Sequence, residues 1–274
     1  MNVVVVLVRK HLVEAKWMLG LSAAAFFALS LLTAWMARGF ERLIESGELG
    51  PDVRRFGFLR ALGGSNQDYS TTALEVCWWN HPVIVMTVLA WAVSRGSASV
   101  AGEIERGTID VTLSRPVSRF AYLGSHVLFV LLGLLAMAGA LVCGSLLGSA
   151  IYTLKSPPSL LTLLRPATMI VTLGLAVFGY TLPFSTMDVV RWRPTLVSSA
   201  ITLGGLLGMS LAPQYPDYRK FLENFSVFQV YAPVTVALKG EPLAFNATVL
   251  LTVFAVGVAV SVGIFSQRDL PSNS

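Results

Sequence analysis

The sequence predicts an all-α membrane protein that forms one transmembrane domain over residues 1–274. Apolar residues make up 54% of the chain and charged residues only 13%, about half the charged fraction of a typical soluble domain. The mean hydropathy is +0.68, which favours a bilayer over water as the solvent. Six apolar segments each have a length near the roughly 20 residues that cross the hydrocarbon core, and their apolar residues run continuously, as in helical spans.

The six expected transmembrane helices lie at about 17–36, 78–97, 122–151, 166–187, 195–212 and 245–265. The second contains Pro82 and Arg95, and the fifth is short and rich in glycine. Glycines in the third and fifth spans allow close approach of neighbouring helices. They could line a dimer seam or the interior of the bundle, and the sequence does not choose between these. The glycines are Gly133, Gly139, Gly144, Gly148, Gly204, Gly205 and Gly208.

Three stretches outside the spans have amphipathic spacing. Residues 1–16 place apolar side chains opposite Arg9, Lys10 and Glu14, which predicts an interfacial helix lying flat before the first span; alternatively, this helix extends the first span. Two long external loops, 37–77 and 213–244, each contain a stretch expected to form a short surface helix, at 38–45 and 218–228. The alternative for both loop stretches is local packing against the bundle.

The distribution of basic residues favours a cytoplasmic N-terminus. With that orientation each side of the membrane carries ten Lys and Arg residues, but the positive-inside rule weights short loops. Arg191 and Arg193 lie in the shortest loop, between the fourth and fifth spans, and this decides the preference. Six spans then place both termini in the cytoplasm of an inner or plasma membrane. The apolar-then-basic start is the reverse of a signal peptide, so the first span should stay in the mature protein.

The sequence shows no motif for catalysis or metal binding. His11, His81 and His126 lie on different segments without a second ligand at metal spacing, and His81 before Pro82 is expected to cap a helix. Cys143 is expected to be a small core residue. No Walker A pattern and no nucleophile motif occur. The net charge of +5 is spread in small clusters that suit anionic lipid headgroups rather than nucleic acid.

Residues 100–121, between the second and third spans, form a compact charged segment. Its charged residues are mostly three to five apart and can pair within a helix. Pro116 cannot continue that helix, so we expect a short helix, a break at Arg115–Pro116, and Ser118 as the cap of the third span. Arg95 is expected to extend its charge toward the interface, or else to pair with Glu103. The segment is either a solvated turn or a stiff connector that contacts a soluble partner.

The run GEIERGTIDVTLSRPVSRFAYLGSH, residues 102–126, resembles the cytoplasmic segment of type-2 ATP-binding-cassette (ABC) transporter permeases. The RKHLVEAKW start and the layout of six spans are also similar to that family. His126 stands where a lysine is common, and the 37–77 loop is longer than in many small relatives. The residues that match the family pattern are Glu103, Glu105, Arg106, Gly107, Thr108, Leu113, Arg115, Pro116, Ser118 and Arg119. Asp110 lies among them and is a further candidate for contact with the ATPase.

The resemblance implies the permease subunit of an exporter, without catalysis of its own. Residues 100–121 would be the coupling helix that docks in a cleft of a cytoplasmic ATPase, which would bind ATP and magnesium. Asp188, Arg191 and Arg193 would form a second cytoplasmic contact. A second permease chain, identical or related, would pair with the first. Two alternatives are a membrane component that transmits force to an envelope complex without moving a solute, and a membrane-embedded enzyme.

Overall fold

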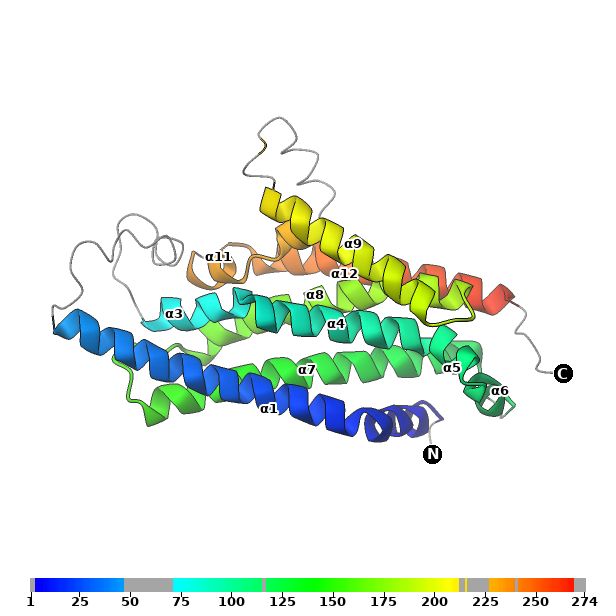
Figure 1. Cartoon of the computed structure of the whole chain (residues 1–274), viewed down its shortest axis with the longest axis horizontal. Helices are drawn as coiled ribbons and strands as arrows, with labels where there is room; N and C mark the ends of the chain where they lie inside the picture. The colour runs from blue at the N-terminus through cyan, green and yellow to red at the C-terminus, as the bar shows by residue number, and fades with distance from the viewer. Residues whose placement is uncertain are drawn as a thin grey trace.

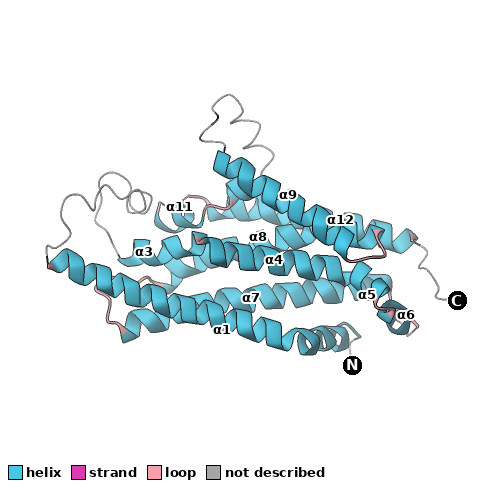
Figure 2. Ribbon diagram, in the orientation of Figure 1, coloured by secondary structure: helices cyan, strands magenta, loops and turns pink. Residues whose placement is uncertain are grey.

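The computed structural model describes residues 3–46, 71–114, 117–211, 215, 227–239 and 241–268. Every regular element in these residues is helical, and the long helices run side by side along an elongated bundle (Figures 1 and 2). The elements are α1 (Val3–Glu45), α3 (Thr71–Cys77), η2 (Trp78–Asn80), α4 (Pro82–Ser99), α5 (Ala101–Glu105), α6 (Thr108–Leu113), α7 (Arg119–Ile151), α8 (Leu160–Met187), α9 (Trp192–Leu211), η3 (Val227–Val230), α11 (Pro233–Leu238) and α12 (Leu243–Gln267).

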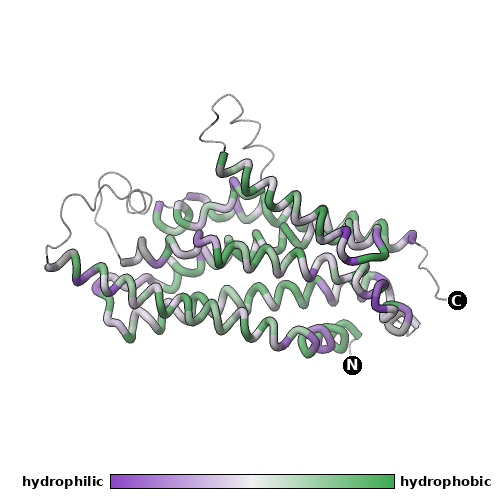
Figure 3. Tube along the Cα trace, viewed as in Figure 1, coloured by the Kyte–Doolittle hydropathy of each residue, from purple (hydrophilic) through white to green (hydrophobic). Residues whose placement is uncertain are grey.

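The chain is a multi-pass membrane protein. In the described residues five helices, α1, α4, α7, α8 and α12, are long and apolar enough to cross a membrane. Hydrophobic residues dominate the middle of the bundle, and hydrophilic residues are concentrated toward its two ends (Figure 3). The expected fifth span coincides with α9, which is not one of these five helices. The all-α membrane fold is therefore confirmed, whereas the count of six spans is not.

The N-terminal region differs from the expected division into separate pieces. The interfacial helix at 1–16, the span at 17–36 and the amphipathic stretch at 38–45 belong to one helix, α1, of 43 residues. The sequence has no proline between Val3 and Glu45 to interrupt it. At 1.5 Å per residue α1 extends over roughly 65 Å, about twice the thickness of the hydrocarbon core. The alternative expectation, in which the N-terminal stretch extends the first span, agrees with this helix.

Glycines of α7 face the interior of the bundle. A Cβ on Gly144 would lie 2.6 Å from the Phe27 carbonyl oxygen of α1, and one on Gly148 would lie 2.6 Å from the Ala34 Cβ. The indole of Trp91 in α4 occupies the space beside Gly133. These three glycines thus allow α1 and α4 to approach α7 closely, and they belong to the bundle interior. A Cβ on Gly139 or Gly204 would meet nothing within 4 Å, so these two do not pack inside the bundle.

The second loop region is described only in part. The amphipathic stretch expected at 218–228 lies outside the described residues except for Val227 and Phe228, which belong to η3; Phe228 is buried. Most of the first loop, residues 47–70, also lies outside them. After η3, the Tyr231 hydroxyl donates a hydrogen bond of 2.7 Å to the Trp79 carbonyl oxygen. This bond connects the chain between η3 and α11 to η2, the turn before α4.

Among the described glycines, Gly257 of α12 and Gly179 of α8 bring two helix backbones closest together. A Cβ on Gly257 would overlap the Gly179 carbonyl group, whereas a Cβ on Gly263, six residues later in α12, would meet nothing within 4 Å. We predict that Gly257→Ala lowers the free energy of unfolding by about 3 kcal/mol, the upper end for overpacking, because backbone must move. Gly263→Ala should leave it unchanged or slightly higher.

Thermal unfolding of the two purified variants in the same detergent tests this prediction. A lower melting temperature for Gly257→Ala alone is expected. Equal melting temperatures for both variants and the wild-type chain would contradict the close crossing of α8 and α12.

Candidate functional site

The charged segment begins at a break in the helix that continues from α4. Helix α4 ends at Ser99, and the chain changes direction at Val100. The Ser185 hydroxyl of α8 accepts hydrogen bonds from the Val100 and Ala101 amides at 3.2 and 3.0 Å and donates one to the Ser97 carbonyl oxygen at 3.0 Å. All these groups are buried. Ser185 therefore satisfies the polar backbone groups that the break would otherwise leave unpaired.

Helix α7 also contributes a hydrogen bond at this break. The Tyr122 hydroxyl of α7 donates a 2.6 Å hydrogen bond to the carbonyl oxygen of Ser99. Residues 101–114 then form a unit of two short helices, α5 and α6, which we call the elbow. It lies at the same end of the bundle as the start of α1 and the end of α12 (Figure 1). The sequence predicted one short helix here, and the structure has two.

The corner of the elbow is built by the residues of the quoted motif. Gly107 has φ = 67°, a left-handed conformation that favours glycine. Across this corner the buried Glu103 carboxylate accepts hydrogen bonds from the Arg106 guanidinium at 2.7 Å and from the Thr108 hydroxyl. Glu103, Arg106, Gly107 and Thr108 are therefore brought together, as the constituents of a fixed turn.

Glu103 also connects the elbow to α1. Its side chain is only 3% exposed, and the Lys10 Nζ lies 3.6 Å from its second carboxylate oxygen. Burial by itself would raise the pKa of Glu103, but the Thr108 hydroxyl, Lys10 and Arg106 together hold that pKa below its usual value. The carboxylate is thus ionised at neutral pH and attracts both cations.

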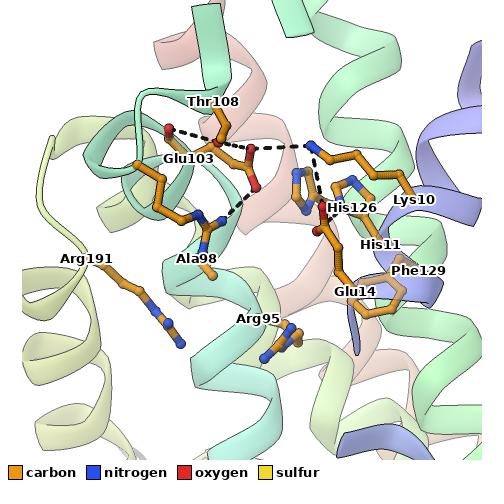
Figure 4. Close-up of a pocket in the computed structure, with 11 residues that line it drawn as sticks. Lys10, His11, Glu14, Arg95, Ala98, Glu103, Thr108, His126, Phe129 and Arg191 are labelled. Atoms are coloured by element: carbon orange, nitrogen blue, oxygen red, sulfur yellow. Dashed lines mark hydrogen bonds and ion pairs between the residues drawn. The ribbon is translucent and has the colours of Figure 1, made fainter. Parts of the chain in front are cut away.

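A cavity of about 430 Å³ lies beside the elbow. Its walls come from α1, α4, α5, α6, α7 and the turn between α8 and α9, and side chains from these elements point toward one another around it (Figure 4). Polar and charged residues dominate the lining, among them Lys10, His11, Arg95, Glu103, His126 and Arg191. No local pattern in the sequence could predict this cavity, because its residues come from segments far apart in the chain.

Two of the three arginines that line the cavity, Arg95 and Arg191, bond through their side chains to groups other than a carboxylate. Arg95 makes no ion pair with Glu103; its Nη2 lies 3.6 Å from the Met18 sulfur. Arg191 binds the Ser94 hydroxyl at 2.9 Å, and Arg193, not Arg191, pairs with Asp188 at 3.7 Å. The residues of the expected second cytoplasmic contact therefore do not share one surface, because Arg191 faces the cavity whereas Arg193 is exposed.

Two histidines that the sequence separates lie side by side. The ring centroids of His11 in α1 and His126 in α7 are 4.1 Å apart, which corrects the expectation that they are isolated. Within the described residues no group of three or more His, Cys, Asp or Glu side chains could hold a metal ion. His81 caps α4 as expected, with its Nδ1 accepting a 3.3 Å hydrogen bond from the Val83 amide.

The far end of the charged segment is tied to α12. The Ser118 hydroxyl accepts a 3.1 Å hydrogen bond from the Ala121 amide, which confirms it as the cap of α7. Arg119 donates hydrogen bonds to the carbonyl oxygens of Phe265 and Arg268, the latter at 2.6 Å, and so satisfies the end of α12. The expected break at Arg115 and Pro116 lies outside the described residues.

Part of the elbow remains open to solvent. Glu105 and Arg106 are exposed and Asp110 is partly exposed. The Glu105 carboxylate also accepts a 3.0 Å hydrogen bond from the Arg191 amide in the turn between α8 and α9. The buried members of the motif thus fix the shape of the elbow, while these three residues are available at its surface.

A second buried carboxylate lies at the opposite end of the bundle. Glu75 of α3 is 3% exposed, and one of its oxygens accepts a hydrogen bond from the Ser145 hydroxyl of α7. Its Oε1 has no hydrogen-bond partner in the described part of the chain. Burial raises the pKa of Glu75 to about 7, although the Ser145 hydroxyl opposes the shift. The sequence analysis missed Glu75 because only tertiary packing buries it.

We predict that Ser185→Ala destabilises the junction of α4 and α5. The change leaves two buried amides without their acceptor, which costs about 1–3 kcal/mol. Thr168→Ala in the same helix, whose hydroxyl bonds only to the Leu164 carbonyl of its own helix, is the matched control. Thermal unfolding should show a clearly lower melting temperature for Ser185→Ala. Equal effects of the two substitutions would contradict the role of Ser185.

We predict that Glu75→Gln changes how stability depends on pH. Because the folded chain binds this proton more tightly than the unfolded chain, the contribution of Glu75 to stability falls as pH rises from about 4.5 to about 7. Glutamine removes that loss, so the variant should exceed the wild-type chain by on the order of 3 kcal/mol at pH 8 and match it at pH 4.5. Melting temperatures across this range, with exposed Glu241→Gln as control, test it; parallel curves would refute the shift.

Comparison with protein-family models finds no match for this chain, and comparison with curated protein sequences finds none either. The family resemblance of residues 102–126 therefore rests on their own sequence pattern.

Proposed function

We propose that this chain is the transmembrane permease subunit of an ABC transporter similar to the type-2 exporters, driven by a separate ATPase subunit. The observation that carries the proposal is the elbow. It is a compact polar unit that lies between two membrane helices, α4 and α7, and buried hydrogen bonds fix it to the bundle. Its residues are those of the sequence pattern that resembles the coupling helix of that family.

The connections of the elbow suit the transmission of force. It continues directly from α4 and leads toward α7. Ser185 joins its start to α8, and Lys10 joins Glu103 to α1. At the start of α7, Arg119 holds the end of α12, and Arg268 in turn donates a 3.0 Å hydrogen bond to the carbonyl oxygen of Asp188 after α8. A push on the elbow would therefore move several helices together and favour one of two states of the bundle.

The docking surface for the ATPase would be the accessible part of the elbow, Glu105, Arg106 and Asp110, with Arg193 and Asp188 beside it. ATP and magnesium would be bound by that ATPase. A second permease chain, identical or related, would cover part of the exposed apolar surface of the bundle, and lipid would cover the rest. In this arrangement α9 completes six spans, and both termini and the elbow are on the cytoplasmic side of an inner or plasma membrane.

A direct test is the capture of the partner. A tagged full-length chain, purified from its own membrane in mild detergent, should bring down an ATPase that carries a Walker A motif, and this ATPase should hydrolyse ATP faster when substrate is present in proteoliposomes. Capture of an ATPase whose hydrolysis responds to an envelope complex but to no solute would favour force transmission over transport. Failure to capture any ATP-binding subunit would contradict both.

We predict that Asp110→Arg reduces recovery of the ATPase at least several-fold, because it reverses one charge on the proposed docking surface. The matched control is Glu241→Arg, the same reversal at an exposed site near α11, at the opposite end of the bundle. Quantitative immunoblotting of the co-purified subunit measures the effect. Equal recovery with both variants would place the docking surface elsewhere.

A further inference from the structure

The cavity beside the elbow has an excess of positive charge. Four cationic side chains line it, Lys10, Arg95, Arg106 and Arg191, against the two carboxylates Glu14 and Glu103. Both carboxylates are already engaged. Glu103 is bound by Arg106 at 2.7 Å and Lys10 at 3.6 Å, and Glu14 lies 3.8 Å from Lys10.

The remaining two cations, Arg95 and Arg191, have no carboxylate partner in the part of the chain that the structure describes. Among the described residues no carboxylate lies within ion-pair distance of Arg95 or Arg191. Arg95 belongs to a helix that can cross the membrane, where an uncompensated charge costs several kcal/mol. Such a charge is expected to have a partner, and the described part of the chain does not supply it.

Buried polar atoms at the cavity also lack partners among the described residues. The Nε of Arg95 and the Nε2 of His126 are buried and have no hydrogen-bond partner among the described residues. His126 is only 6% exposed, and both side chains line the cavity (Figure 4). A buried polar atom left unpaired costs about 1–3 kcal/mol. Two such atoms beside one polar cavity point to a ligand that accepts hydrogen bonds.

We propose that this cavity binds a phosphate-bearing anion, with Arg95 and Arg191 as its principal ligands and His126 as a hydrogen-bond donor. Guanidinium groups bind phosphate oxygens in pairs of hydrogen bonds. The donors come from α4, α7 and the turn between α8 and α9, three directions that suit a tetrahedral group with several acceptor oxygens. The volume of about 430 Å³ lies within the range of small-molecule sites.

The phosphate group could belong to a lipid headgroup or to a free phosphate. The chemistry is the same for both, since the cavity offers cations and donors to the phosphate itself. A bound phosphate would connect Arg95 of α4 with Arg191 in the turn after α8, beside the elbow. Binding of this anion by the purified chain does not depend on the proposed ATPase partner.

The test measures the melting temperature of the delipidated full-length chain in a neutral detergent. Inorganic phosphate is compared with chloride at equal ionic strength, and phosphatidic acid is compared with phosphatidylcholine in mixed micelles. Saturating anion should raise the melting temperature by at least about 4 °C. A rise with inorganic phosphate identifies the free anion as sufficient. A rise with phosphatidic acid alone assigns the site to a headgroup.

The variant Arg95→Gln should abolish this rise. Without anion it should melt at the wild-type temperature or above, because it removes a charge that no described carboxylate pairs with. Lys16→Gln, which removes one exposed charge from α1 outside the cavity, should keep the full rise. The proposal is overturned if neither probe raises the wild-type melting temperature, if Arg95→Gln retains the rise, or if Lys16→Gln loses it equally.

Discussion

The hydroxyl of Ser185 is the contact on which the geometry of the charged end depends. A helix that stops inside an apolar bundle exposes amides and carbonyls for which hydrocarbon offers no partners. The Ser185 hydroxyl accepts hydrogen bonds from two amides and donates one to a carbonyl oxygen at the junction of α4 and α5, while the Tyr122 hydroxyl donates one to the carbonyl oxygen of Ser99. With these bonds the chain can leave the direction of α4 at little cost. Without them the junction of α4 and α5 would bury unpaired backbone amides and carbonyl groups.

Charge then gives the elbow its shape and its attachments. The Glu103 carboxylate is buried where only cations and donors from three elements surround it, so that α1, α5 and the start of α6 are held by one group. Four cationic side chains line the cavity beside the elbow but only two carboxylates do, so the cavity keeps a net positive charge. The rigid corner and the candidate anion site are thus two consequences of one arrangement of basic residues around Glu103.

Local signals in the sequence predicted the parts that depend on neighbouring residues. The caps Ser118 and His81 and the positions of α7, α8 and α12 follow from hydrophobic runs and helix-start residues. Apolarity alone could not orient these helices, because lipid and core accept the same side chains: Cys143, expected in the core, is exposed. Neither could spacing reveal Ser185 at the α4 end, the contact of His11 with His126, or the burial of Glu75, since each depends on segments far apart in the chain.

Hydrogen exchange of the backbone amides tests the central claim, that the elbow is a fixed part of the bundle. The account predicts that the amides of Val100 and Ala101, and the peptide through Thr108, exchange at least about 100-fold more slowly than unstructured chain, because their hydrogen bonds open only with the surrounding helices. Exchange of this peptide at the rate of free amides, in a chain whose α8 remains protected, would contradict the account.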